Sequence, residues 1–270
     1  MTPMRLAPFV LAATLFAQQQ QLEPGAILER ARQTALNYSR NLPNFLCTEE
    51  IARYDDVLST GKWTGVDRLT IEVRFSGQVE DYKLTARNGH ATTASMDEVS
   101  GAFTRGEFAS SLLLIFQESS HAEFEFQKWQ TRRKRHLAVF QYHVRAPNSR
   151  YTLRSGTQTA VVAYHGVVEI LPDTGEVFRW TVESDPPEGF PMTQSSLQME
   201  YDYRTVDSAE YLVPVRSEME SVQRSGIPRE KLDKLPSRLR AMYSRPERRR
   251  NVIEYKNYRR FSTESTVTFK

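Results

Sequence analysis

The sequence contains a single cysteine, Cys47, among 270 residues. Without a second cysteine the chain lacks an intramolecular disulfide, a CxxC redox pair and a cysteine-based zinc site. We expect Cys47 to be a buried, inert thiol rather than one that pairs with another chain. Long apolar runs are missing too: no stretch after the N-terminus approaches the ~18 residues that indicate a membrane-spanning helix. These absences favour a folded, soluble domain.

Recognisable catalytic motifs are also absent. There is no GxSxG nucleophile elbow, no Walker-type GxxxxGK[ST] loop and no GxGxxG after a strand. The histidines show no HExxH spacing, and His136 and His143, on one expected strand, point to opposite faces. We therefore expect no metal, no cofactor and no enzymatic activity. The least favoured alternative is a hydrolase-like enzyme in which His136, His143 or His165 meets carboxylates across strands.

Positive charge is concentrated near the C-terminus. The chain has 36 Lys and Arg against 33 Asp and Glu, a net charge of +3, whereas residues 216–270 alone carry +8. Most of this excess lies in an insertion at residues 224–250, which holds ten basic and three acidic residues. Pro236 interrupts the near-helical spacing of its leucines, so we expect two short helical turns or a mobile loop there.

The basic insertion allows two interpretations. It is either a solvated segment that keeps the protein soluble or a site of contact with anionic lipid head groups. Nucleic acid is not an expected partner, because no recognition motif accompanies the charge. The candidate residues for contact with an anionic surface are Arg238, Arg240, Arg248, Arg249 and Arg250.

The N-terminus, residues 1–17, has the features of a secretory signal peptide. Arg5 precedes an apolar stretch that ends at Ala17, and a polar run of glutamines follows. The apolar stretch is too short to span a bilayer. We expect cleavage near Ala17 and a mature chain, residues 18–270, in the periplasm or secreted. The alternative is a disordered or core-packed N-terminus.

The mature chain has the pattern of one α+β domain. Between Pro24 and Leu42 apolar residues recur every three or four positions, which predicts an amphipathic helix ended by Pro43. After it the apolar period falls to two, and tight-turn sequences such as Ser76-Gly77 separate the apolar stretches. Short links of this kind join antiparallel neighbours, so we predict an antiparallel sheet of about nine to eleven strands.

One apolar segment interrupts the strands. Thr104-Arg105-Gly106-Glu107 fits a capping box, and the predicted helix at 108–116 is apolar nearly all round. A helix of this kind cannot lie on a wet surface. The predicted fold is therefore a strongly curved antiparallel half-barrel, with the N-terminal helix and this apolar helix packed in its concave face.

Two resemblances to known families add to these patterns. The stretch 164–180, YHGVVEILPDTGEVFRW, resembles the strand-turn-strand of periplasmic lipoprotein-carrier and outer-membrane lipoprotein-sorting proteins. The chain from residue 23 onward also resembles a family of uncharacterised exported bacterial proteins, through pieces at 42–48, 106–108, 211–215 and 257–261. The carrier resemblance implies an open, curved antiparallel sheet that binds acyl chains, with helices in its concavity. It assigns no ligand residue, because the shared motif is a structural turn.

Two functions fit these features. If the curved sheet encloses more volume than its helix fills, the chain is a non-enzymatic periplasmic binding protein for a lipid, lipoprotein acyl chains or another apolar ligand. If the core is filled, it is an interaction module for an envelope protein or a membrane surface. In both cases we expect a monomer. The candidate cavity residues are Phe108, Leu112, Ile115, Phe124, Phe126, Phe140, Tyr142, Val162, Tyr164 and Trp180.

Overall fold

An amphipathic helix, α1 (Pro24–Asn41), opens the described part of the chain, as its apolar spacing predicts. The computed structural model describes residues 22–99, 106–108, 110–225, 227 and 229–261. Pro24 sits in the first turn of α1, where a missing N–H breaks no helical hydrogen bond. The buried stripe of α1 consists of Ile27, Ala31, Ala35 and Ser39. The expected signal peptide, residues 1–17, lies outside the described residues.

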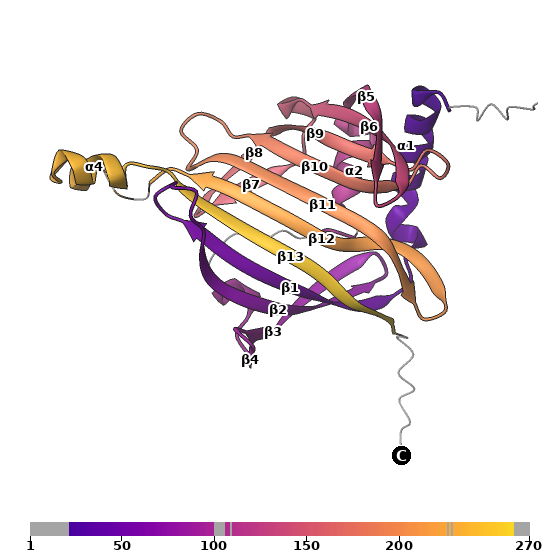
Figure 1. Cartoon of the computed structure of the whole chain (residues 1–270), viewed down its shortest axis with the longest axis horizontal. Coiled ribbons are helices and arrows are strands. Elements are labelled where there is room, and N and C mark those ends of the chain that lie inside the picture. Colours follow the sequence, from indigo (N-terminus) through magenta and orange to yellow (C-terminus); the bar gives the residue numbers. More distant parts are fainter. Residues whose placement is uncertain (1–21, 100–105, 109, 226, 228, 262–270) are drawn as a thin grey trace, which may run out of the picture.

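Eleven strands form one open antiparallel sheet, in the order β4-β3-β2-β1-β13-β12-β11-β10-β9-β6-β5 (Figure 1). Their bounds are β1 (Phe45–Asp56), β2 (Thr64–Ser76), β3 (Val79–Arg87), β4 (His90–Ala91), β5 (Glu123–Arg132), β6 (Arg135–Val144), β9 (Ala163–Ile170), β10 (Val177–Asp185), β11 (Met192–Val206), β12 (Ala209–Gln223) and β13 (Glu247–Arg260). The predicted fold class, a curved antiparallel α+β half-barrel, is confirmed.

The C-terminal strand β13 occupies the middle of the sheet. It pairs with β1, where Ile253 lies opposite Ile51, and with β12, where Asn251 lies opposite Met219. It thereby joins β1–β4 to the other half of the sheet, which consists of β12, β11, β10, β9, β6 and β5. The alternating sequence pattern does not reveal this position, because a period of two shows which residues share a face but not which strands pair.

The two faces of the sheet differ in chemistry. Along β1 and β11 buried residues alternate with more exposed ones, since successive side chains point to opposite faces. The inner face carries the core, and Cys47 lies there at 2% exposure, with a pKa raised by burial. This fits the inert thiol expected from the sequence. The outer face carries cross-strand ion pairs, including Arg248–Glu220, Lys256–Glu50 and Arg259–Glu72.

A short helix, α2 (Ser111–Phe116), lies against the inner face and buries Leu112, Ile115 and Phe116. It begins three residues later than predicted. The N–H of Phe108 donates to Glu80 Oε1 at 2.9 Å, and the N–H of Ser111 donates to the Gly106 carbonyl at 2.9 Å. These bonds hold the preceding residues in a turn rather than a helix. Thr104 of the expected capping box lies outside the described residues.

A separate two-stranded hairpin, β7 (Thr152–Ser155) with β8 (Gln158–Val161), covers part of the inner face. We call it the flap. A small apolar cluster attaches it to the start of β11, formed by Leu153, Val162, Phe190 and Met192. Short 3₁₀ turns connect other elements, at Met96–Glu98, Glu118–Ser120 and Ala146–Asn148.

The turn between β9 and β10, residues 171–176, docks on α1. The Arg30 guanidinium donates to the carbonyl oxygens of Pro172 and Asp173, at 2.7 and 3.0 Å. Gly175 has φ +74°, and a Cβ there would lie 2.7 Å from the Arg30 carbonyl carbon. The turn singled out by the family resemblance therefore fixes the N-terminal helix to the sheet.

The basic insertion forms two short helices, α3 (Arg229–Asp233) and α4 (Ser237–Tyr243), which is the first of the two alternatives expected from Pro236. Strand β13 begins at Glu247, so the last residues of the predicted insertion belong to the sheet. The segment 229–246, which we call the arm, extends beyond the end of the sheet (Figure 1). Among the described helices, none combines the length and the apolar character needed to cross a membrane.

Candidate ligand-binding cavity

A cavity of about 930 Å³ lies between the inner face of the sheet, α2 and the flap. Strands β6, β9, β10, β11 and β12 contribute its walls. Another side is formed by Met96, Val99, Glu107, Ser110, Ser111, Leu114 and Ile115. Its apolar lining consists of Met96, Val99, Leu114, Ile115, Tyr142, Tyr151, Leu153, Tyr164, Trp180, Val182, Met192, Leu197 and Met219. Its volume is in the range of roughly 300–1,000 Å³ that is typical of small-molecule sites.

The aromatic wall of the cavity is held in place by hydrogen bonds. Tyr142 donates to the carbonyl of Thr181 at 2.8 Å, and Tyr164 donates to the carbonyl of Leu114 at 2.5 Å. Burial raises the pKa of both tyrosines, so their hydroxyls stay neutral donors. Because each hydroxyl already has an acceptor, the rings present apolar surface to the cavity.

The end of the cavity near the flap carries polar side chains. Ser195 of β11 and Ser221 of β12 are cross-strand partners, and both line the cavity. Ser221 is 2% exposed, and its Oγ has no hydrogen-bond partner among the described residues. Thr152 and Arg154 of the flap complete this end. The cavity therefore has a largely apolar wall, with polar side chains near the flap and, at Glu107, Ser110 and Ser111, beside α2.

A group of buried acidic side chains borders the cavity beside α2. Tyr82 donates to Glu107 Oε2 at 2.7 Å and also contacts Glu80. Glu49 is 4% exposed, and its Oε1 has no hydrogen-bond partner among the described residues. Burial, followed by the nearby Glu107 and Glu80, raises the pKa of Glu49 well above its usual range. Glu49 therefore favours its protonated form, and no sequence pattern pointed to this group of side chains.

Four of the ten cavity residues proposed from the sequence line the cavity: Ile115, Tyr142, Tyr164 and Trp180. The other six pack elsewhere in the core: Phe108, Leu112, Phe124, Phe126, Phe140 and Val162. Phe108, for example, makes ring contacts with Phe45 and Tyr255, at centroid distances of 5.0 and 5.9 Å. The apolar pattern of the sequence places these side chains inside, but it does not separate those that fill the core from those that border a cavity.

Sequence reasoning missed the flap and the serines that line the cavity. Ser155-Gly156 between two short segments was a usable hairpin signal, since Gly156 adopts φ +59° in the turn. The serines carried no such signal. A serine in a strand can be recognised as part of a binding site only when the structure shows that it faces a cavity.

The histidines considered for an enzyme do not line this cavity. His143 and His165 are cross-strand partners on β6 and β9, and His165 lies 3.7 Å from Glu183 and from Asp185. His136 stacks on Trp129 instead, at a centroid distance of 4.8 Å. Within the described residues, no group of three or more His, Cys, Asp or Glu could hold a metal ion.

The arginines proposed for an anionic surface fall into two sets. Arg238 and Arg240 lie on α4, and Arg240 donates to the carbonyls of Asp233 and Leu235. Arg248, Arg249 and Arg250 belong to β13. Their nearest carboxylates are those of Glu220, Glu247 and Glu218, at 3.2, 3.5 and 2.5 Å.

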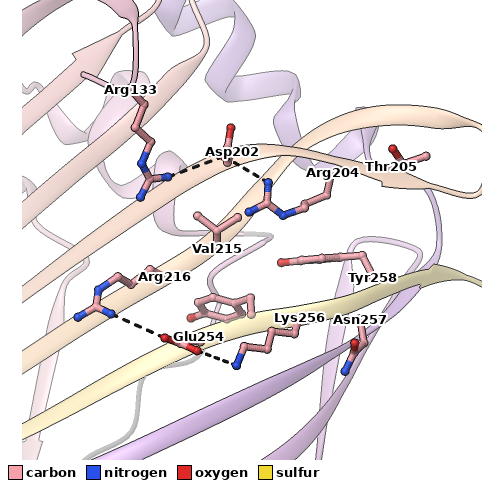
Figure 2. A pocket seen from close by; sticks show the side chains of 11 residues that line it. Arg133, Asp202, Arg204, Thr205, Val215, Arg216, Glu254, Lys256, Asn257 and Tyr258 are labelled. Atoms are coloured by element: carbon pink, nitrogen blue, oxygen red, sulfur yellow. Dashed lines mark ion pairs between the residues drawn. The ribbon is translucent and has the colours of Figure 1, made fainter. Parts of the chain in front are cut away.

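A second hollow, of about 610 Å³, opens between β12 and β13 on the charged outer face (Figure 2). The two strands pair only as far as Arg216 opposite Glu254, and beyond that point they diverge. The charges around this seam are in ion pairs: Arg133 and Arg204 with Asp202, and Arg216 and Lys256 with Glu254 (Figure 2).

Tyrosines close the edge of β12 along this seam. Tyr258 donates to the carbonyl of Pro214 at 2.6 Å, and Tyr38 donates to the carbonyl of Leu212 at 3.0 Å. Pro214 has no N–H to offer a further strand, which is why proline is found at sheet edges. The seam is thus blocked against strand addition, and we take the inner cavity as the functional site.

Comparisons with known protein families and with curated proteins give no match. Among solved structures, the chain is similar to a LolA superfamily protein from Nitrosomonas europaea, with 11% identity over 91% of this chain and 97% of that chain and a TM-score of 0.39. A DUF1329 family protein from Desulfovibrio piger shows 9% identity over 90% and 97%, with a TM-score of 0.39. An outer membrane lipoprotein-sorting protein domain from Vibrio parahaemolyticus shows 14% identity over 89% and 94%, again with a TM-score of 0.39. The Vibrio parahaemolyticus domain bears the name of one of the two classes that the stretch 164–180 resembles.

Proposed function

We propose that this protein is an exported, non-enzymatic binding protein that holds an acyl chain or a similar apolar ligand between its sheet and α2. The observation that supports the proposal is the cavity of about 930 Å³ between the sheet, α2 and the flap, where a fully packed core would leave no space. Periplasmic or secreted location is part of the proposal and follows from the signal-peptide features of residues 1–17.

The energetics of such binding are favourable. Each buried CH₂ group contributes roughly 0.8 kcal/mol, so a chain of about a dozen carbons supplies ~10 kcal/mol before the costs of association. The hydrogen bonds of Tyr142 and Tyr164 hold the cavity wall in place before a ligand binds. Binding therefore costs less conformational entropy. No catalytic residue is needed for this function.

The test is a titration with N-phenyl-1-naphthylamine, a neutral probe whose fluorescence rises in apolar surroundings, followed by displacement with dodecanol. Leu197 lines the cavity, so Leu197→Trp fills it. Gln194 of the same strand is exposed, so Gln194→Trp is the matched control with the same added side chain. We expect wild type and Gln194→Trp to bind the probe and release it to dodecanol, and Leu197→Trp to bind at least about tenfold more weakly, a loss of about 1.4 kcal/mol. Equal binding by both variants would contradict the proposal, provided that both unfold cooperatively.

We further propose that the arm contacts an anionic membrane surface or an envelope partner. Leu239 and Tyr243 of α4 are both 39% exposed and lie four residues apart, on one side of the helix. Arg238 is exposed beside them. An exposed apolar pair flanked by basic residues suits the interface of an anionic bilayer.

Replacing residues 229–243 with a Gly-Ser linker tests the role of the arm while leaving β12 and β13 intact. We expect the wild type to co-sediment with phosphatidylglycerol vesicles and the linker variant to stay in the supernatant, with probe binding unchanged in both. Pure phosphatidylcholine vesicles are the control. If the linker variant co-sediments with phosphatidylglycerol vesicles as wild type does, the arm is not the membrane contact and the proposal for the arm is wrong.

A further inference from the structure

The charged side chains that line the cavity are few and are placed at different ends. Among the described lining residues they are Glu107, beside α2, and Arg154, on the flap. Glu107 is 3% exposed and accepts a hydrogen bond from Tyr82. Arg154 is exposed and forms no ion pair with another described residue. The cavity rim thus carries a cation whose charge the neighbouring residues do not balance.

One polar side chain of the cavity lining, Ser221, also lacks a hydrogen-bond partner among the described residues. Ser221 Oγ is buried and unpartnered, so it is a free donor for an acceptor atom inside the cavity. Ser195, the cross-strand neighbour of Ser221, lies near Tyr151, the residue just before the flap. Burial raises the pKa of Tyr151, and a hydrogen bond with the Ser195 side chain offsets part of that rise. Leaving a buried hydroxyl unsatisfied costs free energy that an oxygen atom of a ligand would recover.

We propose that the cavity selects amphiphiles with an anionic head group, which Arg154 binds at the rim while Ser221 donates to an acceptor oxygen and the chain extends toward Trp180 and α2. This inference rests on the proposed function and specifies its ligand. A guanidinium presents paired N–H donors that match the oxygens of a carboxylate or a phosphate. The charged side chain beside α2 is the carboxyl of Glu107, which offers an anionic head group no attraction.

The test compares four ligands that share a dodecyl chain, each displacing N-phenyl-1-naphthylamine from the full mature chain at pH 8. The ligands are dodecanoate, dodecyl phosphate, dodecanol and dodecyltrimethylammonium. We expect the two anions to bind on the order of tenfold more tightly than dodecanol, and the cation most weakly. The ratio of dodecanoate to dodecyl phosphate then distinguishes a fatty-acid carboxylate from a phospholipid phosphate as the preferred source of the anion.

The variants separate a direct contact from a general charge effect. Arg154→Gln should bring the anions to within about threefold of dodecanol without changing dodecanol itself, and Arg154→Lys should keep part of the preference. Arg150→Gln removes the same charge from an exposed position just before the flap and should leave the preference intact. Ser221→Ala should weaken the anions while preserving the fold, since it deletes one oxygen atom.

Each contrary result has a distinct meaning. If dodecanol and dodecanoate bind wild type equally, or if Arg150→Gln acts like Arg154→Gln, the head-group assignment is wrong while the acyl-binding function stands. Tighter binding of the ammonium ligand also overturns the assignment and directs attention to Glu107. If neither the probe nor any dodecyl ligand binds, the proposed function itself fails, and this inference fails with it.

Discussion

The hydroxyl of Tyr164 on β9 donates a hydrogen bond of 2.5 Å to the carbonyl oxygen of Leu114 on α2. Leu114 is in the last turn of a six-residue helix, where carbonyls have no partner within the helix. Both residues line the cavity. This hydrogen bond therefore gives the Leu114 carbonyl a partner. It also sets the distance between α2 and the sheet, which is the width of the binding site.

Removing that hydroxyl should loosen α2. We expect Tyr164→Phe to lower the free energy of unfolding by about 1 kcal/mol, because the Leu114 carbonyl loses its partner. Amide exchange should quicken at Gln117, whose N–H donates to Leu113 in the same helix end. The control is Tyr243→Phe on the exposed face of α4, for which denaturant midpoints should stay within experimental error. Identical midpoints for both variants would show that the bond does not hold the helix.

The docking of α1 on the β9–β10 turn can be tested by comparing alanine substitutions at two glycines. At Gly175 a Cβ would meet the backbone of Arg30 and Ala31 at 2.7–2.8 Å, whereas at Gly61 nothing lies within 4 Å, although both have positive φ. Gly61→Ala should therefore cost only the backbone strain, about 1 kcal/mol. Gly175→Ala should cost a further ~1–3 kcal/mol, because α1 must shift. Calorimetric melting of the two variants gives the comparison, and equal losses would mean that α1 does not depend on this close approach.

The buried Glu49 predicts a pH dependence with a definite sign. Its pKa in the folded state is raised by burial and by Glu107 and Glu80, so the folded chain holds the proton more tightly than the unfolded chain. Its contribution to stability is then fully present below the unfolded pKa, near 4.5, and is lost as the pH rises toward the folded pKa. Glu49→Gln should remove this slope.

At neutral pH Glu49→Gln should stabilise the protein by about 1 kcal/mol or more, since each tenfold change in proton affinity corresponds to about 1.4 kcal/mol. Glu50→Gln, one residue along on the opposite face, removes an exposed pair with Lys256 and should change stability by at most about 1 kcal/mol, with the pH slope retained. Urea unfolding of wild type and both variants from pH 4 to pH 8 measures this. A Glu49→Gln profile parallel to wild type would contradict the assigned protonation.

The fold was largely readable from the sequence, because its signals are local. The spacing of Ile27, Ala31 and Ala35 marked α1, and Pro236 lies between two short helices, one of the two alternatives that the sequence left open for the arm. The place of β13 between β1 and β12 was not readable, since strand order depends on pairing across nearly 200 residues. The start of α2 was misplaced because Glu80, far along the chain, binds the Phe108 amide.

The site was less predictable than the fold. Alternation identified Tyr142, Tyr164 and Trp180 as inward-facing, yet it equally selected Phe124 and Phe140, which fill the core. The difference arises from how tightly neighbouring elements pack, and only three-dimensional packing reveals it. No sequence motif identifies Arg154 or Ser221 as a ligand-binding residue, because their proposed role depends on the absence of partners within the described part of the folded chain.

The most direct test of the central claim is to map where an acyl chain lies. Photolabelling the mature chain with a dodecyl alcohol that carries a terminal diazirine, followed by peptide mass spectrometry, reports the residues within reach of the chain end. We predict labels on the lining of the cavity, in residues 110–115 of the α2 region and in β10 around Trp180 and Val182, with loss of labelling in Leu197→Trp and not in Gln194→Trp. Labels confined to the arm or to the outer face of the sheet, or labelling that is the same in both variants, would contradict the account.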